Sequence, residues 1–189
     1  MRKSVLITSV FVVLTFFTAR GQGQVGIGEK QFNAGTGYAG GYVPLYAGVY
    51  FGVHRDITIG PKMVLSFYRD SYLDHYNWGD IMYYDRIIDF GGAFVFDYHF
   101  NRVLNIPGQF DLYAGSDLGL FGYSSKEIVE TWEFDYITTD TYEETGTYIN
   151  FNLHAGGRYI FPSGLGLNMQ MDLDRFNIFG LYFGISKKF

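Results

Sequence analysis

The feature that most constrains this chain is an alternation of apolar residues with polar or small ones, which recurs along nearly all of it. Between residues 147 and 161, Ile149 and Phe151 fall on one face of an extended chain, whereas Asn150 and Asn152 fall on the other. A period of two is typical of β-strands whose faces meet different surroundings. Helical periodicity is absent from residue 22 onward, so the pattern predicts an all-β fold.

Eight segments carry this pattern, and each is close to the roughly 9–11 residues that a tilted strand needs to cross a bilayer. They are residues 30–38, 45–53, 57–69, 86–100, 110–123, 147–161, 165–173 and 177–189. An even number of such strands, joined consecutively, is typical of bacterial membrane barrels. The sequence therefore predicts an eight-stranded antiparallel up-and-down transmembrane β-barrel.

The two faces differ in a way that indicates which of them looks outward. The apolar face carries no charge over most strand centres, as contact with lipid requires. The other face carries Gly, Asn, Asp, Lys, Arg and Tyr. Eight strands enclose a space only just wide enough for side chains, which the 25 glycines and 17 tyrosines suit. We expect the apolar face to contact lipid, with Phe67, Phe121 and Tyr148 in an aromatic girdle at one interface.

The lengths of the connections predict the orientation of the barrel. Short connections at 54–56 and 162–164, with a longer one at 101–109, fall at one end, which we assign to the periplasm. The long connections 70–85 and 125–146 both fall at the other end and are expected to be extracellular loops. Within the second loop, residues 133–142 also alternate, which suggests that the strands extend there as a hairpin.

The N-terminal segment, residues 1–21, has the features of a secretory signal peptide. Arg2 and Lys3 precede an apolar run over residues 5–17, and Ala19 and Gly21 are small residues at the positions that a signal peptidase reads. We expect cleavage before Gln22 and a barrel domain over residues 22–189. Nucleic acid is not expected as a partner, because the net charge is −5. There is no cysteine, which excludes a disulfide or a thiolate metal site.

The last strand resembles the C-terminal signature of outer-membrane barrels, in which a final Phe is preceded by alternate apolar residues. The matching residues are Leu181, Phe183, Ile185 and Phe189, and Lys187 departs from the pattern. The resemblance implies that the barrel-assembly machinery recognises this strand.

Other stretches resemble the small outer-membrane barrels of Bacteroidetes, namely residues 43–60, 97–101, 156–159 and 164–168. The resemblance covers most of the chain after the signal peptide. It implies the architecture of the OmpA/OmpX kind, an outer-membrane location and contact with outer-membrane lipid and lipopolysaccharide. It implies little about activity.

Charged residues on the polar face are candidates for a network inside the barrel. By their parity and position, these lumen residues are Lys62, Asp97, Asp111, Asp117 and Arg158. A charge out of contact with water has to be paired, so we expect ion pairs that plug the lumen. The alternative is a gate, whose pairs exchange and open a narrow porin-like channel.

Histidines are the other residues that could carry chemistry. His54, His99 and His154 lie on the polar face but not at metal-ligand spacing, so neither a metal nor a cofactor is predicted. A lipid-modifying enzyme would need a nucleophile within reach of a histidine base. No serine sits at the depth of His154 on an adjacent strand, and Ser116 falls on the lipid face. No catalytic residue is predicted.

The long outer connections are acidic and aromatic. A contact surface is predicted on 125–146, formed by Trp132, Phe134, Tyr136 and Tyr142. We expect a host or cell-surface partner at 70–85 and 125–146, and hence a structural or adhesive role. A narrow channel is the second reading, and a lipid-modifying enzyme or a secreted lipocalin-like binder are more distant ones.

Overall fold

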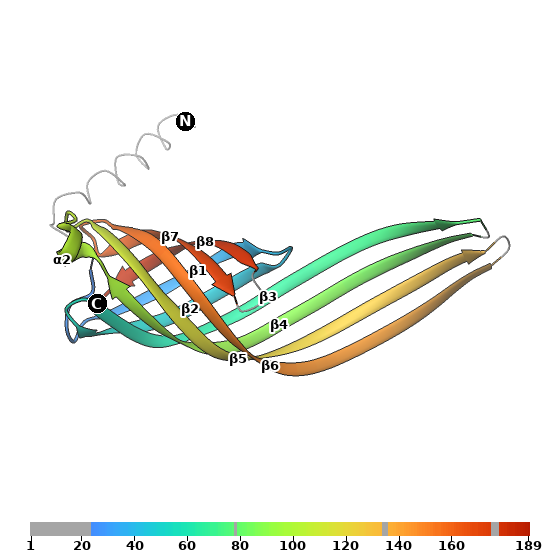
Figure 1. Cartoon of the computed structure of the whole chain (residues 1–189), viewed down its shortest axis with the longest axis horizontal. Coiled ribbons are helices and arrows are strands. Elements are labelled where there is room, and N and C mark those ends of the chain that lie inside the picture. Colours follow the sequence, from blue (N-terminus) through green and yellow to red (C-terminus); the bar gives the residue numbers. More distant parts are fainter. Residues whose placement is uncertain (1–23, 78, 134–135, 175–177) are drawn as a thin grey trace, which may run out of the picture.

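The computed structural model describes residues 24–77, 79–133, 136–174 and 178–189, and in it eight antiparallel strands close into a barrel (Figure 1). Each strand pairs with its neighbours in chain order, and β1 pairs with β8 to close the ring. The strands are β1 (Lys30–Ala39), β2 (Val43–His54), β3 (Ile57–Tyr76), β4 (Gly79–His99), β5 (Phe110–Glu133), β6 (Tyr136–Ile160), β7 (Leu165–Asp174) and β8 (Phe179–Lys188). The predicted fold class is confirmed. The predicted signal peptide, residues 1–21, lies outside the described residues.

The barrel is apolar outside and polar inside. Phe94 and Leu118 on the outer side are 55% and 58% exposed, whereas Asp97 and Asp117 inside are 1% and 0% exposed. A lipocalin-like barrel would have the opposite arrangement, with its apolar face around a ligand. An exposed apolar belt of this extent is unstable in water and is covered by bilayer hydrocarbon. The chain is therefore a transmembrane barrel of the outer-membrane type.

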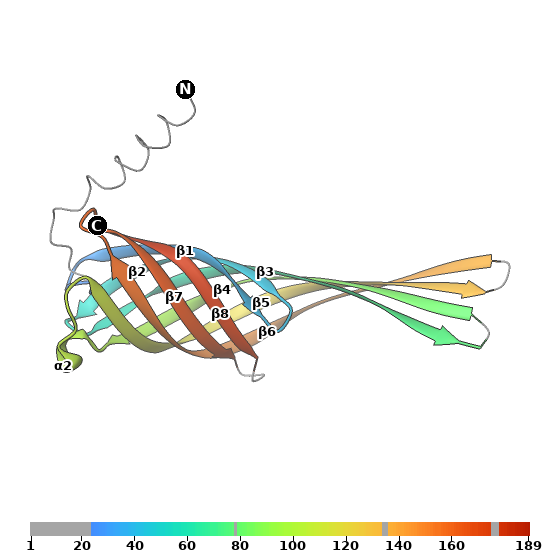
Figure 2. The ribbon, with the colours of Figure 1, turned by 90° about the horizontal axis from the view of Figure 1, so that it is seen from above.

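Four consecutive strands continue well past the rim of the barrel (Figures 1 and 2). The pairing of β2 with β3 ends at Val43 and Phe67, and the pairing of β6 with β7 ends at Asn152 and Asp174. Beyond those points only β3, β4, β5 and β6 pair with one another. We call this part the projecting sheet and define it as residues 68–76, 79–87, 125–133 and 136–144.

The projecting sheet corrects one prediction and confirms another. Residues 70–85 and 125–146 were expected to be loops, but most of the first belong to β3 and β4 and most of the second to β5 and β6. β3 and β4 pair without interruption up to Tyr76 and Gly79. The hairpin expected over residues 133–142 is confirmed, and the paired strands on either side of it reach much further. Apolar alternation fades in 70–85 because both faces of the sheet are in water there.

The opposite end of the barrel, which we call the turn end, carries a short helix, α2 (Asn101–Leu104), in the longer connection. Asn101 fastens this helix to β5, since its side chain donates to the Phe110 carbonyl at 2.5 Å and accepts from the Leu112 amide at 3.1 Å. Arg102 donates hydrogen bonds to Asp56, and these bonds hold the pKa of the Asp56 carboxyl below its usual value. No helix in the described part of the chain is long and apolar enough to cross a membrane.

The predicted aromatic girdle is wrong for two of its residues. Phe67 faces outward and is 40% exposed, but Phe121 is buried in the lumen and stacks on Tyr148 at 5.7 Å between ring centroids. Phe121 shares its parity with Asp117, which also points inward. Both rings therefore belong to the polar face and not to the lipid face.

The membrane-spanning arrangement predicts the effect of a charge on the outer side. Leu118→Arg, near the middle of the barrel part of β5, should lower the free energy of unfolding by about 2–4 kcal/mol, because the guanidinium would enter hydrocarbon. Thr139→Arg adds the same charge on the projecting sheet and should change it by no more than about 0.5 kcal/mol. Urea unfolding in lipid vesicles measures both values. Equal effects would contradict the membrane span.

Candidate functional site

Two groups of residues can carry a function: the polar lumen of the barrel and the projecting sheet. At the turn end of the lumen, Arg158 Nη1 donates to Asp111 Oδ2 at 2.7 Å, and His99 Nδ1 lies 2.7 Å from the other oxygen of the same carboxylate. The guanidinium of Arg158 also lies over the ring of Tyr113, 4.8 Å from its centroid. All four side chains are buried. They fill this part of the barrel.

A second group lies nearer the middle of the barrel. Lys62 and Asp117 form a buried ion pair, and Asn152 Nδ2 donates to the second Asp117 oxygen at 2.9 Å. His154 Nε2 lies 2.6 Å from Asp97 Oδ1, and its Nδ1 lies 3.8 Å from Asp117. These contacts join Lys62, Asp117, His154 and Asp97 into one connected set.

The structure places all five sequence-derived lumen residues inside the barrel. It pairs Lys62 with Asp117 and Arg158 with Asp111, whereas Asp97 pairs with His154. Sequence reasoning did not include His154 or His99 in the network. The signal was present, because His99 shares its parity with Asp97 on β4 and His154 shares its parity with Arg158 on β6. Each of these three carboxylates has a cationic or histidine partner, which reduces the cost of its burial.

Thr58, His99 and Asp111 are connected in the order hydroxyl, histidine, carboxylate, as in a catalytic triad. His99 Nε2 lies 3.0 Å from the Thr58 hydroxyl, and His99 Nδ1 lies 2.7 Å from Asp111. However, the three residues are each no more than 1% exposed, and none of them lines a cavity found in the described part of the chain. The three side chains thus form a buried hydrogen-bond chain.

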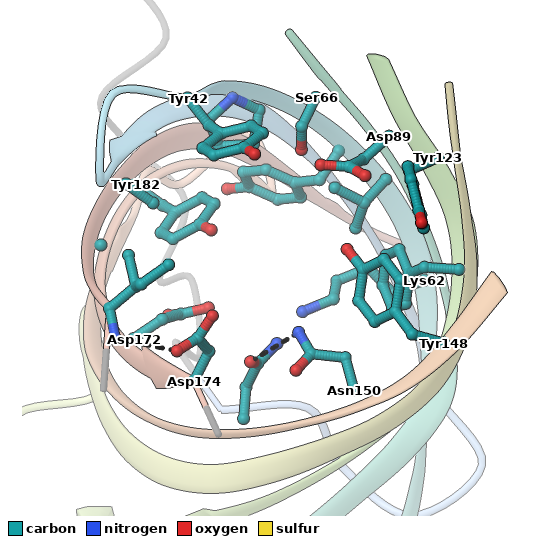
Figure 3. A pocket seen from close by; sticks show the side chains of 18 of the residues that line it. Tyr42, Lys62, Ser66, Asp89, Tyr123, Tyr148, Asn150, Asp172, Asp174 and Tyr182 are labelled. Atoms are coloured by element: carbon teal, nitrogen blue, oxygen red, sulfur yellow. Dashed lines mark hydrogen bonds between the residues drawn. The ribbon is translucent and has the colours of Figure 1, made fainter. Parts of the chain in front are cut away.

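The lumen is hollow at the end from which the sheet projects. A cavity of about 520 Å³ opens there, and Figure 3 shows Lys62 reaching into it from one side and Asp172 and Asp174 facing it from the other. Its wall is rich in tyrosines: Tyr42, Tyr46, Tyr50, Tyr123, Tyr148 and Tyr182. We call this cavity the vestibule. Lys62 lines the vestibule and also belongs to the buried pair with Asp117.

The histidines and carboxylates of the described residues are not gathered into a metal site. Among the residues that the structure describes, no group of three or more His, Asp or Glu side chains is placed to hold a metal ion. His54, which parity had assigned to the lumen, lies at the exposed end of β2, where the register with β3 shifts. The three histidines are thus separated and have different surroundings.

The projecting sheet has two faces of different composition. The face that continues the lumen side, here the inner face, carries many of its tyrosines, and Tyr72 and Tyr83 stack there at 4.5 Å between centroids. Tyr72, Tyr76, Tyr136 and Tyr142 on this face are 46–59% exposed. Acidic residues lie among them, in a row formed by Asp70, Asp85 and Glu127. The outer face continues the lipid-facing side.

The residues predicted as a loop contact surface are split between these faces. Trp132 lies on the outer face opposite Ile137, whereas Tyr136 and Tyr142 lie on the inner face. Phe134 lies outside the described residues. Sequence reasoning missed the inner-face tyrosines of β3, since 70–85 was expected to be a loop. The spacing of Tyr68, Tyr72 and Tyr76, all of even number, was the available signal.

The residues of the proposed assembly signature lie on the last strand. Phe183 and Ile185 are each 50% exposed on the lipid-facing side of β8, and Leu181 shares their parity. The Phe189 amide donates to the Lys30 carbonyl at 2.9 Å, and the Phe189 side chain is 74% exposed. The apolar residues of this strand are therefore accessible from the membrane.

No protein-family model matches the sequence, and no curated protein matches it significantly. Among solved structures, the N-terminal β-barrel domain of OprF from Pseudomonas aeruginosa is 13% identical with a TM-score of 0.47, over 87% of this chain and 99% of that one. Ail, the attachment invasion locus protein of Yersinia pestis, is 10% identical with a TM-score of 0.45, over 86% and 99%. Neisserial surface protein A is 12% identical with a TM-score of 0.40, over 85% and 95%. Likenesses this weak say nothing about function.

The lumen network predicts a strong dependence of stability on Arg158. Arg158→Met should lower the free energy of unfolding by about 3–5 kcal/mol, because Asp111 would stay buried without its arginine. Urea unfolding in detergent micelles, with the heat-modifiable shift in gel mobility, measures the loss.

A matched control is available on the projecting sheet. Lys126 donates to Glu143 at 2.9 Å in an exposed ion pair, so Lys126→Met should cost no more than about 1 kcal/mol. If Arg158→Met unfolds at the same urea concentration as Lys126→Met, the buried network does not stabilise the barrel.

Proposed function

We propose that this chain is a structural and adhesive outer-membrane barrel, and that the projecting sheet is its contact surface. The observation that carries the proposal is the continuation of β3, β4, β5 and β6 beyond the rim as a paired four-stranded sheet. Long strands of this kind are not needed to span a bilayer, for which about 9–11 residues suffice. Connections on the extracellular side are the longer ones in such barrels, so the sheet is assigned to the cell exterior.

The inner face of the sheet has the composition of a binding surface. Tyrosines supply large contact area at a small cost in conformational entropy, and exposed aromatics are enriched where proteins bind partners. The acidic row of Asp70, Asp85 and Glu127 lies on the same face, so a partner with basic groups would be favoured. β3 and β6 are the edge strands of the projecting sheet, and among the described residues no strand pairs with their outer edges, which therefore supply further hydrogen-bonding groups.

The barrel itself is proposed to be closed to ions and without enzymatic activity. The ion pairs Lys62–Asp117 and Arg158–Asp111 occupy the lumen below the vestibule, which supports a plugged interior. The burial of Thr58, His99 and Asp111 supports a structural role for the triad-like chain.

Three further parts of the proposal concern export and ancestry. Residues 1–21 are removed as a signal peptide, and the strand that carries Phe183, Ile185 and Phe189 is recognised by the barrel-assembly machinery. The chain belongs with the Bacteroidetes-type small barrels that its sequence resembles. The exposure of the apolar residues of β8 is consistent with recognition by an assembly factor.

The adhesive role is tested on cells that display the protein. Tyr136→Ser together with Tyr142→Ser should reduce adherence to an epithelial monolayer severalfold, because contact area is lost from the inner face. The control is Thr139→Ser together with Thr141→Ser, on the outer face of the same strand, which should leave adherence unchanged. If cells that display the unchanged protein adhere no better than cells that lack it, the proposal is refuted.

The closed lumen is tested by planar-bilayer conductance. The purified protein should show no stepwise openings, because the two buried ion pairs and their neighbours fill the section below the vestibule. Stepwise openings of the unchanged protein would favour the alternative, a narrow porin-like channel, for which the vestibule would be the mouth.

A further inference from the structure

The outer face of the projecting sheet carries a row of basic residues that the functions above do not use. Arg69 on β3 lies directly opposite Arg86 on β4, and Arg86 lies directly opposite Lys126 on β5. Glu143 on β6 is the fourth member of the same row. We call Arg69, Arg86 and Lys126 the basic row. It brings three cations side by side on neighbouring strands.

The height of the basic row is fixed by the strands that carry it. One step closer to the barrel on the same face, Phe67 lies opposite Ile88, and the two are 40% and 38% exposed toward lipid. The register between β3 and β4 runs without a shift through this region, so Arg69 and Arg86 point to the same side as Phe67 and Ile88. Two residues of a strand span about 7 Å. The basic row therefore lies about 7 Å beyond the outward-facing Phe67 and Ile88.

The two arginines lack an anionic partner. Lys126 Nζ is paired with Glu143 Oε1 at 2.9 Å, whereas neither Arg69 nor Arg86 makes a hydrogen bond or an ion pair through its side chain with any residue that the structure describes. Like charges directly opposite each other on a sheet are destabilising. The pair is exposed and needs a counter-charge from outside the chain.

The acidic residues of the same strands cannot supply that charge. Asp70, Asp85 and Glu127 are the immediate sequence neighbours of the three basic residues, and they form the next row of the sheet. Because successive side chains of a strand point to opposite faces, these carboxylates lie on the inner face. In these two rows of β3, β4 and β5, the three acids therefore lie on the inner face and the three bases on the outer face.

We propose that the basic row binds the phosphate groups of an anionic glycolipid or phospholipid headgroup in the outer leaflet. Arginine presents a planar fork of donors that matches phosphate oxygens in a bidentate manner, and two opposed guanidinium groups can share one phosphate. Basic residues at a membrane surface are attracted to anionic lipids. A lipid is favoured over free phosphate because Phe67 and Ile88 lie directly below, where acyl chains attached to the bound headgroup would pack.

The proposal is tested by counting bound lipids on the full-length protein with native mass spectrometry. Protein in zwitterionic detergent is incubated with lipid A, which carries phosphate groups, or with phosphatidylcholine. The unchanged protein should retain lipid A in preference to phosphatidylcholine. Arg69→Gln together with Arg86→Gln should reduce the fraction that carries lipid A at least fivefold, since the shared anion site is removed.

The control removes two charges at the other end of the barrel. Lys30→Gln together with Lys187→Gln should retain lipid A, because Lys30 lies over the Phe51 ring and Lys187 donates to the Ser163 carbonyl. Equal losses in both double variants would show general charge attraction and would overturn the proposal. So would equal retention of the two lipids, or displacement of lipid A by millimolar inorganic phosphate.

The readout is independent of adhesion. Each variant is used only if it keeps its heat-modifiable gel mobility, which shows that the barrel is folded. A failure of the adherence experiment leaves the lipid result intact, since the two experiments address opposite faces of the projecting sheet.

Discussion

The structure depends on the closure of the hydrogen-bond ladder from β1 to β8. Bilayer hydrocarbon offers no partner for a backbone amide or carbonyl, so an open strand edge within it would be prohibitively costly. The pairing of β1 with β8, from Gln31 opposite Lys188 to Ala39 opposite Gly180, removes the last edges of the spanning part. Once the ring is closed, its outer side has to be apolar and its narrow interior has to be filled. The remaining features of the barrel follow from those two requirements.

The interior is filled by alternating very small residues with large polar ones. Gly115 illustrates the fit, because a Cβ atom there would lie 2.0 Å from the Phe96 carbonyl oxygen and 2.8 Å from His154 Nε2. The absence of a side chain at this position leaves room for the contact between His154 and Asp97. Burial of the charges is tolerated because each aspartate in this region has a partner on another strand. These residues form a buried polar core, and the vestibule lies on its side toward the projecting sheet.

Much of this arrangement could be predicted from the period of the sequence. Alternation located the barrel strands, and parity placed Lys62, Asp97, Asp111, Asp117 and Arg158 inside. Individual partners could not be predicted, because the tilt and stagger of the strands decide which residues share a depth. That is why His154 was not recognised as the partner of Asp97. The projecting strands were missed for a different reason: water lies on both of their faces, so hydrophobic alternation has no cause to persist.

On the projecting sheet, residues that are adjacent in the chain belong to the two different proposed surfaces, the acidic inner face and the basic row. Arg69 and Asp70 are neighbours in the chain, yet they serve faces that meet different surroundings. The same applies to Arg86 with Asp85 and to Lys126 with Glu127. A slip of one residue in the pairing of these strands would exchange the two faces. The long uninterrupted registers of β3 with β4 and of β4 with β5 therefore keep Asp70, Asp85 and Glu127 on one face and Arg69, Arg86 and Lys126 on the other.

The four long strands are consecutive, and this makes the rim of the barrel uneven. Half of the circumference stands up as a wall, while the half formed by β1, β2, β7 and β8 stops near the level of Gly40 and Asp174 (Figure 2). The mouth of the vestibule is thus shielded on one flank and open on the other. A solute or a neighbouring protein that approaches along the membrane surface can therefore reach the vestibule from the side of β1, β2, β7 and β8. From the opposite side it meets the projecting sheet first.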